Sequence, residues 1–222
     1  MYKVDLHTHS IASPDGSLNE DNYRKMLETG RLDCIAVTDH NTIAFAKELH
    51  ANLGDRIIVG EEITTLDGEI IGLYLTKPIK PGMSAVDTAR AIKEQGGLVC
   101  IPHPFETVRK GIPIVVLDAI ADRVDMIEVR NGRAVFQNKS RQAEAWATEH
   151  RVAGVASSDA HGWHGWGRTY TTVAEMPTRG TLVKLLANAT YKVGLPGIRG
   201  VLYPKLNRIR RRRRMTDTGG SA

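Results

Sequence analysis

The chain has few of the residues that mark secreted or membrane proteins. It has only two cysteines, Cys34 and Cys100, each inside a predicted strand, which indicates small buried side chains rather than a disulfide framework. It has no run of about 18 apolar residues, so no membrane-spanning helix is predicted. A predicted strand begins within three residues of Met1 and leaves no room for a secretory signal. We therefore expect a cytoplasmic protein, and the 41% of apolar residues is enough for one sizeable core.

The chain also has almost no excess charge outside its C-terminus. The formal net charge is +5, and residues 205–222 hold seven basic and one acidic side chain, so the rest of the chain carries 5 − 6 = −1. Arg208 and Arg210–Arg214 place six arginines in seven residues. Such blocks are usually disordered arms suited to nucleic acid or anionic membranes, and a solvated tail without a partner is the alternative. We expect one domain over 1–203 and a basic, disordered tail over 204–222.

Six short apolar runs each lead into imidazole or carboxylate side chains, which is the most informative feature present. The groups that follow the runs are His7 and His9 with Asp15 further on, His40, Glu61 and Glu62, His103, Glu128, and Asp159 with His161. A single histidine beside an apolar run is usually a core or surface residue. Packing alone, however, gives no reason to place titratable groups at one end of strand after strand, because burying them without partners is costly.

These groups can converge only if the strands are parallel and share one rim, which is the geometry of an α/β barrel. Mixed nitrogen and oxygen donors suit zinc, manganese or iron(II) better than magnesium or calcium. Helical patterns that fill the gaps predict βαβ units. They cover residues 18–28, 43–53, 84–95, 114–121, 138–150 and 181–188. A hairpin over 57–64 and 69–75 interrupts the alternation, and short strands are predicted at 169–173 and 191–193.

The order of these motifs resembles that of a known family. The matching segments are Asp5-Leu6-His7-Thr8-His9-Ser10, Thr38-Asp39-His40, Gly60-Glu61-Glu62, Pro102-His103-Pro104-Phe105, Ile127-Glu128 and Ser158-Asp159-Ala160-His161. They are similar to the signature motifs of the PHP (polymerase and histidinol phosphatase) superfamily, over residues 1 to about 175, and most similar to its small stand-alone metal-dependent phosphoesterases. The resemblance implies a distorted seven-stranded β/α barrel with a metal cluster at the C-terminal rim of the strands.

The resemblance also implies the ligands of two to three divalent metal ions, zinc, manganese or iron. The three expected sets are His7, His9, Glu62 and Asp159; Glu62, His103 and Glu128; and Asp15, His40 and His161. Glu62 is preferred to Glu61 because the family pattern places the ligand two residues after the glycine. Many relatives carry histidine at the position of Glu128, and some carry one in the segment matching Glu69–Leu73, where this chain has none.

The activity that the resemblance implies is hydrolysis of phosphate esters by a metal-activated hydroxide. The expected substrate is a small phosphorylated metabolite or nucleotide. One alternative is a nuclease that trims DNA or RNA ends, drawn to nucleic acid by the arginine run. Another is a non-catalytic metal-binding module, against which the intact ligand series counts.

Other residues are expected to support this chemistry. Arg109 and Arg133 are candidates for binding phosphate, because a guanidinium matches phosphate oxygens; the alternative for both is a solvated surface arginine. The loop from His161 to Arg168 contains two tryptophans and His164. We interpret it either as a stacking surface with His164 as proton donor to the leaving group, or as a cover for the barrel end. Asp5 and Asp39 are expected to orient imidazoles.

Overall fold

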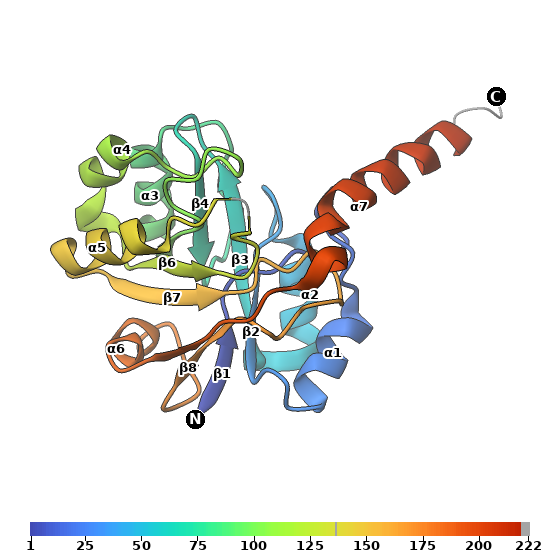
Figure 1. Ribbon diagram of the computed structural model, residues 1–222, viewed down its shortest axis with the longest axis horizontal. Helices are drawn as coiled ribbons and strands as arrows, with labels where there is room; N and C mark the ends of the chain where they lie inside the picture. Colours follow the sequence, from blue (N-terminus) through green and yellow to red (C-terminus); the bar gives the residue numbers. More distant parts are fainter. Residues whose placement is uncertain (136, 219–222) are drawn as a thin grey trace.

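The computed structural model describes residues 1–135 and 137–218 of the chain (Figure 1). Its strands are β1 (Tyr2–Asp5), β2 (Cys34–Val37), β3 (Ile57–Thr64), β4 (Glu69–Leu73), β5 (Leu98–Ile101), β6 (Met126–Asn131), β7 (Ala153–Ser157), β8 (Tyr170–Val173) and β9 (Thr190–Lys192). Its helices are α1 (Glu20–Glu28), α2 (Ala44–Leu53), α3 (Ala85–Glu94), α4 (Ile114–Ala119), α5 (Ser140–His150), α6 (Leu182–Leu186) and α7 (Gly197–Thr218), with short 3-10 turns at Gly54–Arg56 and Ala121–Arg123.

The strands form one curved sheet that nearly closes into a barrel. Its order is β7-β6-β5-β4-β3-β2-β1-β8-β9. Strands β1, β2 and β3 are parallel, as are β5, β6 and β7, and the reversed strand β4 lies between the two sets. A bridge between Thr8 and Ala160 brings the chain after β1 next to the chain after β7. The α/β barrel prediction is confirmed with nine strands instead of seven, because β8 pairs with β1 and β9 extends that edge.

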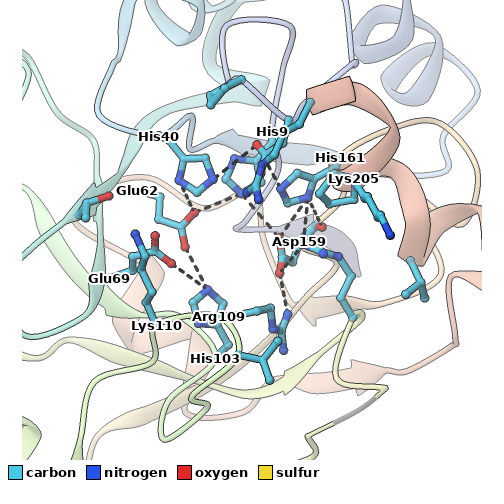
Figure 2. A pocket seen from close by; sticks show the side chains of 18 of the residues that line it. His9, His40, Glu62, Glu69, His103, Arg109, Lys110, Asp159, His161 and Lys205 are labelled. Atoms are coloured by element: carbon cyan, nitrogen blue, oxygen red, sulfur yellow. Dashed lines mark hydrogen bonds and ion pairs between the residues drawn. The ribbon is translucent and has the colours of Figure 1, made fainter. Parts of the chain in front are cut away.

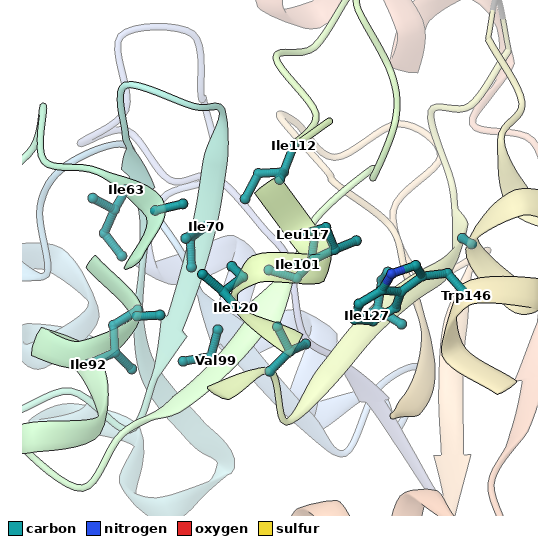
Figure 3. Close-up of a cluster of buried hydrophobic side chains, with 14 of the residues drawn as sticks. Ile63, Ile70, Ile92, Val99, Ile101, Ile112, Leu117, Ile120, Ile127 and Trp146 are labelled. Carbon is teal, nitrogen blue, oxygen red and sulfur yellow. The ribbon is translucent and has the colours of Figure 1, made fainter. Parts of the chain in front are cut away.

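The apolar runs become strands because both of their faces are buried. In β2, Cys34 and Ala36 pack with a cluster drawn from seven strands, whereas Ile35 and Val37 pack with residues of α1 and α2. Strand β5 follows the same alternation, and its other face joins the large apolar cluster of α3, α4 and α5 (Figure 3). Continuous apolar runs are typical of parallel strands covered on both sides. Both cysteines are free and buried.

The structure places residues 204–218, which the sequence predicts as part of a disordered tail, in helix α7. Helix α7 begins at Gly197, so the expected boundary at 203/204 falls inside it. It is held to the barrel by Asn207, whose amide donates to the carbonyl oxygens of Asp15 (2.8 Å) and His161 (3.1 Å). Arginine is also a good helix former, so an arginine run is compatible with a helix. Residues 219–222 of the expected tail lie outside the described residues.

The first half of α7 packs closely on the loop that follows β7. A Cβ atom at Gly162 would lie 2.6 Å from the ring of Tyr203, so only glycine permits this approach. The second half projects away from the barrel (Figure 1). In the part of the chain that the structure describes, no helix combines the length and apolar character needed to cross a membrane.

Candidate metal centre

The imidazoles and carboxylates lie at one end of the barrel, around a cavity of about 930 Å³ (Figure 2). The chain turns sharply where it leaves two of the strands, since His103 and Asp159 have positive φ values of 28° and 52°. Non-glycine residues in this region are strained, and such strain clusters at functional sites. The candidate ligands reach the cavity from the ends of β1, β2, β5 and β7 and from within β3.

Glu62 is the carboxylate around which the histidines gather. Its Oε1 lies 3.0 Å from Nε2 of His103. Its Oε2 lies 3.5 Å from Nε2 of His7, 3.2 Å from Nε2 of His9 and 3.2 Å from Nδ1 of His40. The side chain of Glu61 instead accepts a hydrogen bond from the backbone N–H of Ile79 at 2.8 Å, away from these rings. Glu62 therefore has the position needed for a bridging ligand.

Three groups of donor atoms are close enough to hold a cation, with all atoms of each group within 4.8 Å of one another. The groups are His7, His9 and Asp159; His7, Glu62 and His103; and His9, Asp15, His40 and His161. They overlap with the three expected ligand sets, with three differences. His7 and His9 are each shared between two groups, Glu62 belongs to one group and not to two, and Glu128 belongs to none.

The hydrogen bonds behind His7 and His9 determine which ring nitrogen faces the centre. Nδ1 of His7 lies 2.9 Å from Oε1 of Glu128, which accepts its proton. Nδ1 of His9 lies 3.2 Å from Oγ of Ser13, whose own proton is donated to Asp39. In their neutral forms both rings therefore direct the unprotonated Nε2 to the centre, and the two Nε2 atoms are 3.0 Å apart. Histidines that bind a metal usually have such a hydrogen-bond partner on the ring nitrogen that faces away from the metal.

A buried acceptor without a hydrogen-bond partner supports the fit to divalent cations. Among the described residues, Oδ1 of Asp15 is buried and has no such partner. It lies 3.5 Å from Nε2 of His40 and 3.6 Å from Nε2 of His161. Burying a carboxylate oxygen without a hydrogen-bond partner costs free energy unless a cation binds to that oxygen. Imidazole nitrogens with carboxylate oxygens are the donor set of zinc, manganese or iron.

The electrostatics of the centre also favour cations. Burial alone would raise the pKa of Glu62, but His7 and His40 hold it well below its usual range. Burial would likewise raise the pKa of Asp159, but Arg133 and His7 hold it well below its usual value. Both carboxylates are therefore ionised at neutral pH. Burial opposes a charge on His7, yet Asp159, Glu62 and Glu128 raise its pKa well above the usual value. The same carboxylates would attract a metal ion in place of the proton.

Glu128 contacts Nδ1 of His7 and the backbone N–H of His103, and not the imidazole of His103. It sits within β6, so its side chain points into the barrel below the rim. Its Oε1 accepts from His7, and its Oε2 accepts from the backbone N–H of His103 (2.7 Å) and from Asn131 (2.8 Å). With both oxygens occupied in this way, Glu128 supports ligands, which differs from the role expected from the sequence.

Glu69 is a candidate that the sequence did not single out. It begins β4, lines the cavity, and places Oε2 3.8 Å from Nε2 of His103. Burial, together with the nearby charge of Glu62, raises its pKa to about 8. The signal was present in the sequence, because the segment from Glu69 is where some relatives carry histidine. An acid at the start of the second hairpin strand lies opposite the strand that carries Glu62.

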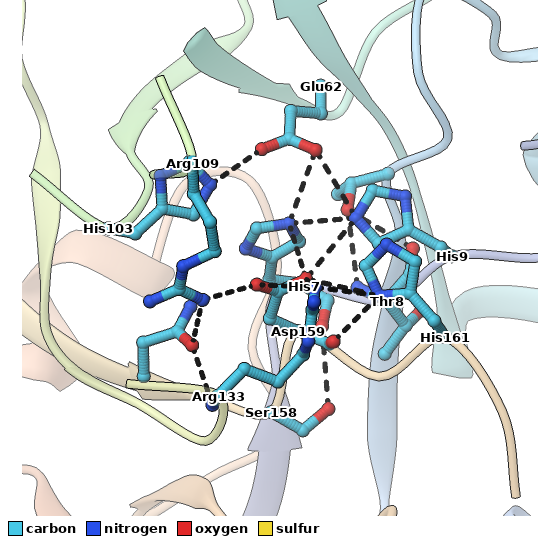
Figure 4. Close-up of polar contacts among 12 residues, drawn as sticks. His7, Thr8, His9, Glu62, His103, Arg109, Arg133, Ser158, Asp159 and His161 are labelled. Atoms are coloured by element: carbon cyan, nitrogen blue, oxygen red, sulfur yellow. Dashed lines mark hydrogen bonds and ion pairs between the residues drawn. The ribbon is translucent and has the colours of Figure 1, made fainter. Parts of the chain in front are cut away.

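Arg109 and Arg133 both lie beside Asp159, but they differ in what they bind (Figure 4). Arg109 makes two bonds to the buried Glu106, at 2.8 and 2.6 Å, and further bonds of 2.6 Å each to Asn131 and Asp159. Four of its donor positions are thus used within the protein. Arg133 makes longer contacts of 3.3 Å through Nη1 to Asp159 and His161, and its Nε is buried without a partner among the described residues. Arg133 has donor capacity to spare, whereas Arg109 has little.

The tryptophan loop covers the barrel, and His164 lies outside the main cavity. Nε1 of Trp166 donates to Asp5 at 3.0 Å, and its ring packs edge-on against Tyr23. His164 is exposed and stacks on Tyr203 with ring centroids 6.1 Å apart, and it does not line the cavity with the candidate ligands. This position does not fit the expected proton donor. Glycines around His164 let the loop reach α7, a contact that the local sequence does not indicate.

Asp5 and Asp39 bind the backbone and hydroxyl groups of the site loops. Asp5 accepts from the backbone N–H and hydroxyl of Ser158, next to Asp159. Asp39 accepts from the hydroxyls of Ser10 and Ser13, and Ser13 in turn contacts Nδ1 of His9. The sequence predicts that the two aspartates orient imidazoles. In the structure they position the candidate ligands through serines and do not contact an imidazole directly.

Helix α7 contributes one wall of the cavity. Its lining residues are Val201, Pro204, Lys205, Arg208 and Ile209. Nη2 of Arg208 lies 2.5 Å from Oδ2 of Asp15. Lys205 and Lys110 lie on opposite sides of the cavity in Figure 2. The acidic centre is thus bordered by cationic side chains, and two of them come from the segment expected to be a tail.

Comparison with known proteins gives matches in sequence and in structure. A family model described as PHP-associated matches residues 137–190. An uncharacterized protein of Methanocaldococcus jannaschii is 34% identical over 149 residues, which cover 61% of this chain and 87% of that protein. A second uncharacterized protein of the same organism is 31% identical over 184 residues, which cover 78% of this chain and 71% of that protein.

The fold is similar to that of a two-domain protein from Bacteroides vulgatus described as containing a "predicted PHP-like metal-dependent phosphoesterase". The TM-score is 0.68 at 20% sequence identity, and the match covers 93% of this chain and 69% of that chain. At this identity the likeness shows the fold alone.

Proposed function

Because this chain belongs to the PHP superfamily, we propose that it is a metal-dependent phosphoesterase that hydrolyses a small phosphorylated metabolite or nucleotide. The observation that carries the proposal is the convergence of three donor groups on one cavity, with Oδ1 of Asp15 buried and unpartnered among the described residues. Two to three divalent cations, zinc, manganese or iron, would be held by these groups. When bound, they supply positive charge that lowers the pKa of a water and offsets the charge of the phosphate oxygens.

The protein's own residues orient the candidate ligands and bind the substrate. Glu128 and Ser13 hold His7 and His9 in the tautomer with Nε2 toward the centre. Arg109 fixes the orientation of Asp159 by a 2.6 Å bond. Arg133 binds a phosphate oxygen of the substrate, and the support for this role is its unpartnered, buried Nε beside the candidate ligands. A guanidinium N–H to a phosphate oxygen is a strong, charge-assisted bond.

The test is an assay of chelator-treated and metal-reloaded protein against sugar phosphates, nucleoside monophosphates and short oligonucleotides. We expect no turnover in chelator, and turnover of at least one small phosphate ester after reloading with zinc, manganese or iron(II). Full activity in chelator would contradict metal dependence. Turnover of oligonucleotides alone would favour the nuclease alternative.

A further inference from the structure

Helix α7 carries a row of apolar side chains that are partly or largely exposed. Ile198, Leu202, Leu206 and Ile209 are 81%, 43%, 41% and 40% exposed. Their spacing of four, four and three residues places them on one side of the helix. Single exposed apolar residues are ordinary, but an aligned row on one helix is typical of a binding surface. We call these four residues the α7 row.

The same helix carries most of the positive charge of the protein. Arg208 and Arg210–Arg214 follow one another along α7, and the chain outside residues 205–222 has a net charge of −1. Successive residues of a helix are about 100° apart, so Arg208 and Arg210 lie on the two sides of the α7 row. The side chain of Arg210 is exposed, whereas Arg211 is exposed in part of its length and donates to the carbonyl oxygen of Ser13 at 2.9 Å. An apolar row flanked by cations is the pattern of a helix that lies in a membrane interface.

We propose that α7 is a docking surface for an anionic lipid membrane. Both features are used there: arginines pair with the anionic headgroups, while the α7 row enters the boundary with the acyl chains. A nucleic acid would use the arginines but leave the apolar row in water. A second copy of the chain would bring two arginine helices together, which like charges oppose. The second half of α7, which carries Arg210–Arg214, projects from the barrel and is accessible to a flat surface (Figure 1), while Ile198, Leu202 and Leu206 lie in the half next to the barrel.

The α7 row lies next to the cavity of the candidate metal centre. Ile209 belongs to the row and also lines the cavity, together with Lys205 and Arg208 of the same helix. Asn207, on the opposite side of α7, ties the helix to the carbonyls of Asp15 and His161. A membrane bound to the row would therefore lie next to the mouth of the candidate metal centre, and docking would bring the centre close to the headgroups.

The test is flotation of the full chain with phosphatidylcholine vesicles, with and without phosphatidylglycerol, at about 0.1 M salt. One variant carries Leu202→Gln and Leu206→Gln. A second replaces Arg210 and Arg212–Arg214 by Gln, so that the residues lining the cavity and Arg211 are kept. Leu66→Gln with Val115→Gln is the matched control, because these side chains are 76% and 77% exposed and lie elsewhere. Circular dichroism and thermal melting check that every variant folds.

We expect the wild type and the control to bind only vesicles that contain phosphatidylglycerol, and binding to weaken as salt rises. The arginine variant, which lacks four arginines, should bind on the order of 600-fold more weakly, at about fivefold per arginine. The leucine variant should bind about tenfold more weakly. Failure of the wild type to float, or binding by the folded leucine variant equal to the wild type, would overturn the proposal.

Two further measurements test the two alternative partners of α7, a nucleic acid and a second copy of the chain. If the arginine variant alone loses affinity for a labelled oligonucleotide, and vesicle binding is absent, the surface is one for nucleic acid. If sedimentation shows a dimer that the leucine variant abolishes, the row joins two copies of this chain. Either result contradicts membrane docking. None of these readouts depends on phosphoesterase activity.

Discussion

Replacing Arg109 by alanine should reduce the stability of the protein more than the sequence alone suggests. The sequence marks Arg109 as a candidate for phosphate binding, with a solvated surface arginine as the alternative, whereas its guanidinium is enclosed by Glu106, Asn131 and Asp159. The variant would leave Asp159, which is 2% exposed, without its 2.6 Å partner. Burial already raises the pKa of Glu106 despite the adjacent arginine, so we expect Glu106 to take up a proton when Arg109 is lost.

Removing one partner of a buried ion pair costs about 3–5 kcal/mol. Because Glu106 can neutralise itself and Arg133 still contacts Asp159 at 3.3 Å, we expect the lower end, about 3 kcal/mol. For a chain of this size, 1 kcal/mol shifts Tm by roughly 2–4 °C, so Arg109→Ala should lower Tm by roughly 6–12 °C. Urea unfolding of metal-free protein at pH 7 gives the free energy directly.

Arg130→Ala is the matched control. Arg130 pairs with Glu144 at 2.7 Å, but both side chains are partly exposed, and such surface pairs contribute about 1 kcal/mol or less. A folded Arg109→Ala protein with the stability of the Arg130→Ala variant, together with a large loss of kcat/KM, would refute the reasoning. It would assign Arg109 to phosphate binding, as the sequence first suggests.

Three further predictions follow from other contacts of the centre. Arg133→Ala should lower kcat/KM for a phosphate ester by about 30- to 1,000-fold, equivalent to about 2–4 kcal/mol, with little change in metal content; an unchanged kcat/KM would remove Arg133 from phosphate binding. Asn207→Leu should speed hydrogen exchange of residues 197–211, since it removes both bonds that tie α7 to Asp15 and His161; exchange equal to the wild type would show that other contacts hold the helix. Metal binding at pH 7 should release protons. Burial opposes the charged form of His9, but bonds to Asp159 and Glu62 raise its pKa to about 9, so the metal affinity should rise with pH up to that value. Calorimetric heats of metal binding that do not depend on the ionisation enthalpy of the buffer would contradict this.

The sequence predicts the barrel and the position of its rim well, for physical reasons. Runs such as Cys34–Val37 and Leu98–Ile101 match β2 and β5 because strands covered on both faces must be apolar throughout. The candidate ligands directly follow or end such runs, so their grouping follows from parallel strands. Ser84 also caps α3, by accepting from the N–H of Asp87 at 3.1 Å.

Contacts between distant segments could not be predicted in this way. Glu128 carries a ligand-type side chain, but only the packing of β6 against the chain after β1 shows that it lies behind His7. The pairing of Arg109 with Glu106 depends on a turn whose conformation is not apparent in the sequence. The arginine run has the composition of a disordered tail, and its anchoring depends on contacts with distant loops. Among them are the amide of Asn207, bound to loops almost 200 and 50 residues away in the chain, and Arg208, bound to Asp15.

The most direct test of the account is the metal content and activity of Glu62→Gln compared with Glu61→Gln. Glu62 lies among His7, His9, His40 and His103, whereas burial raises the pKa of Glu61 to about 7 and its oxygen serves only the backbone of Ile79. We expect elemental analysis to find two to three metal ions in the wild type and in Glu61→Gln, both of them active. Glu62→Gln should lose metal and all measurable phosphoesterase activity. A Glu62→Gln protein with full metal content and full activity would contradict the central claim.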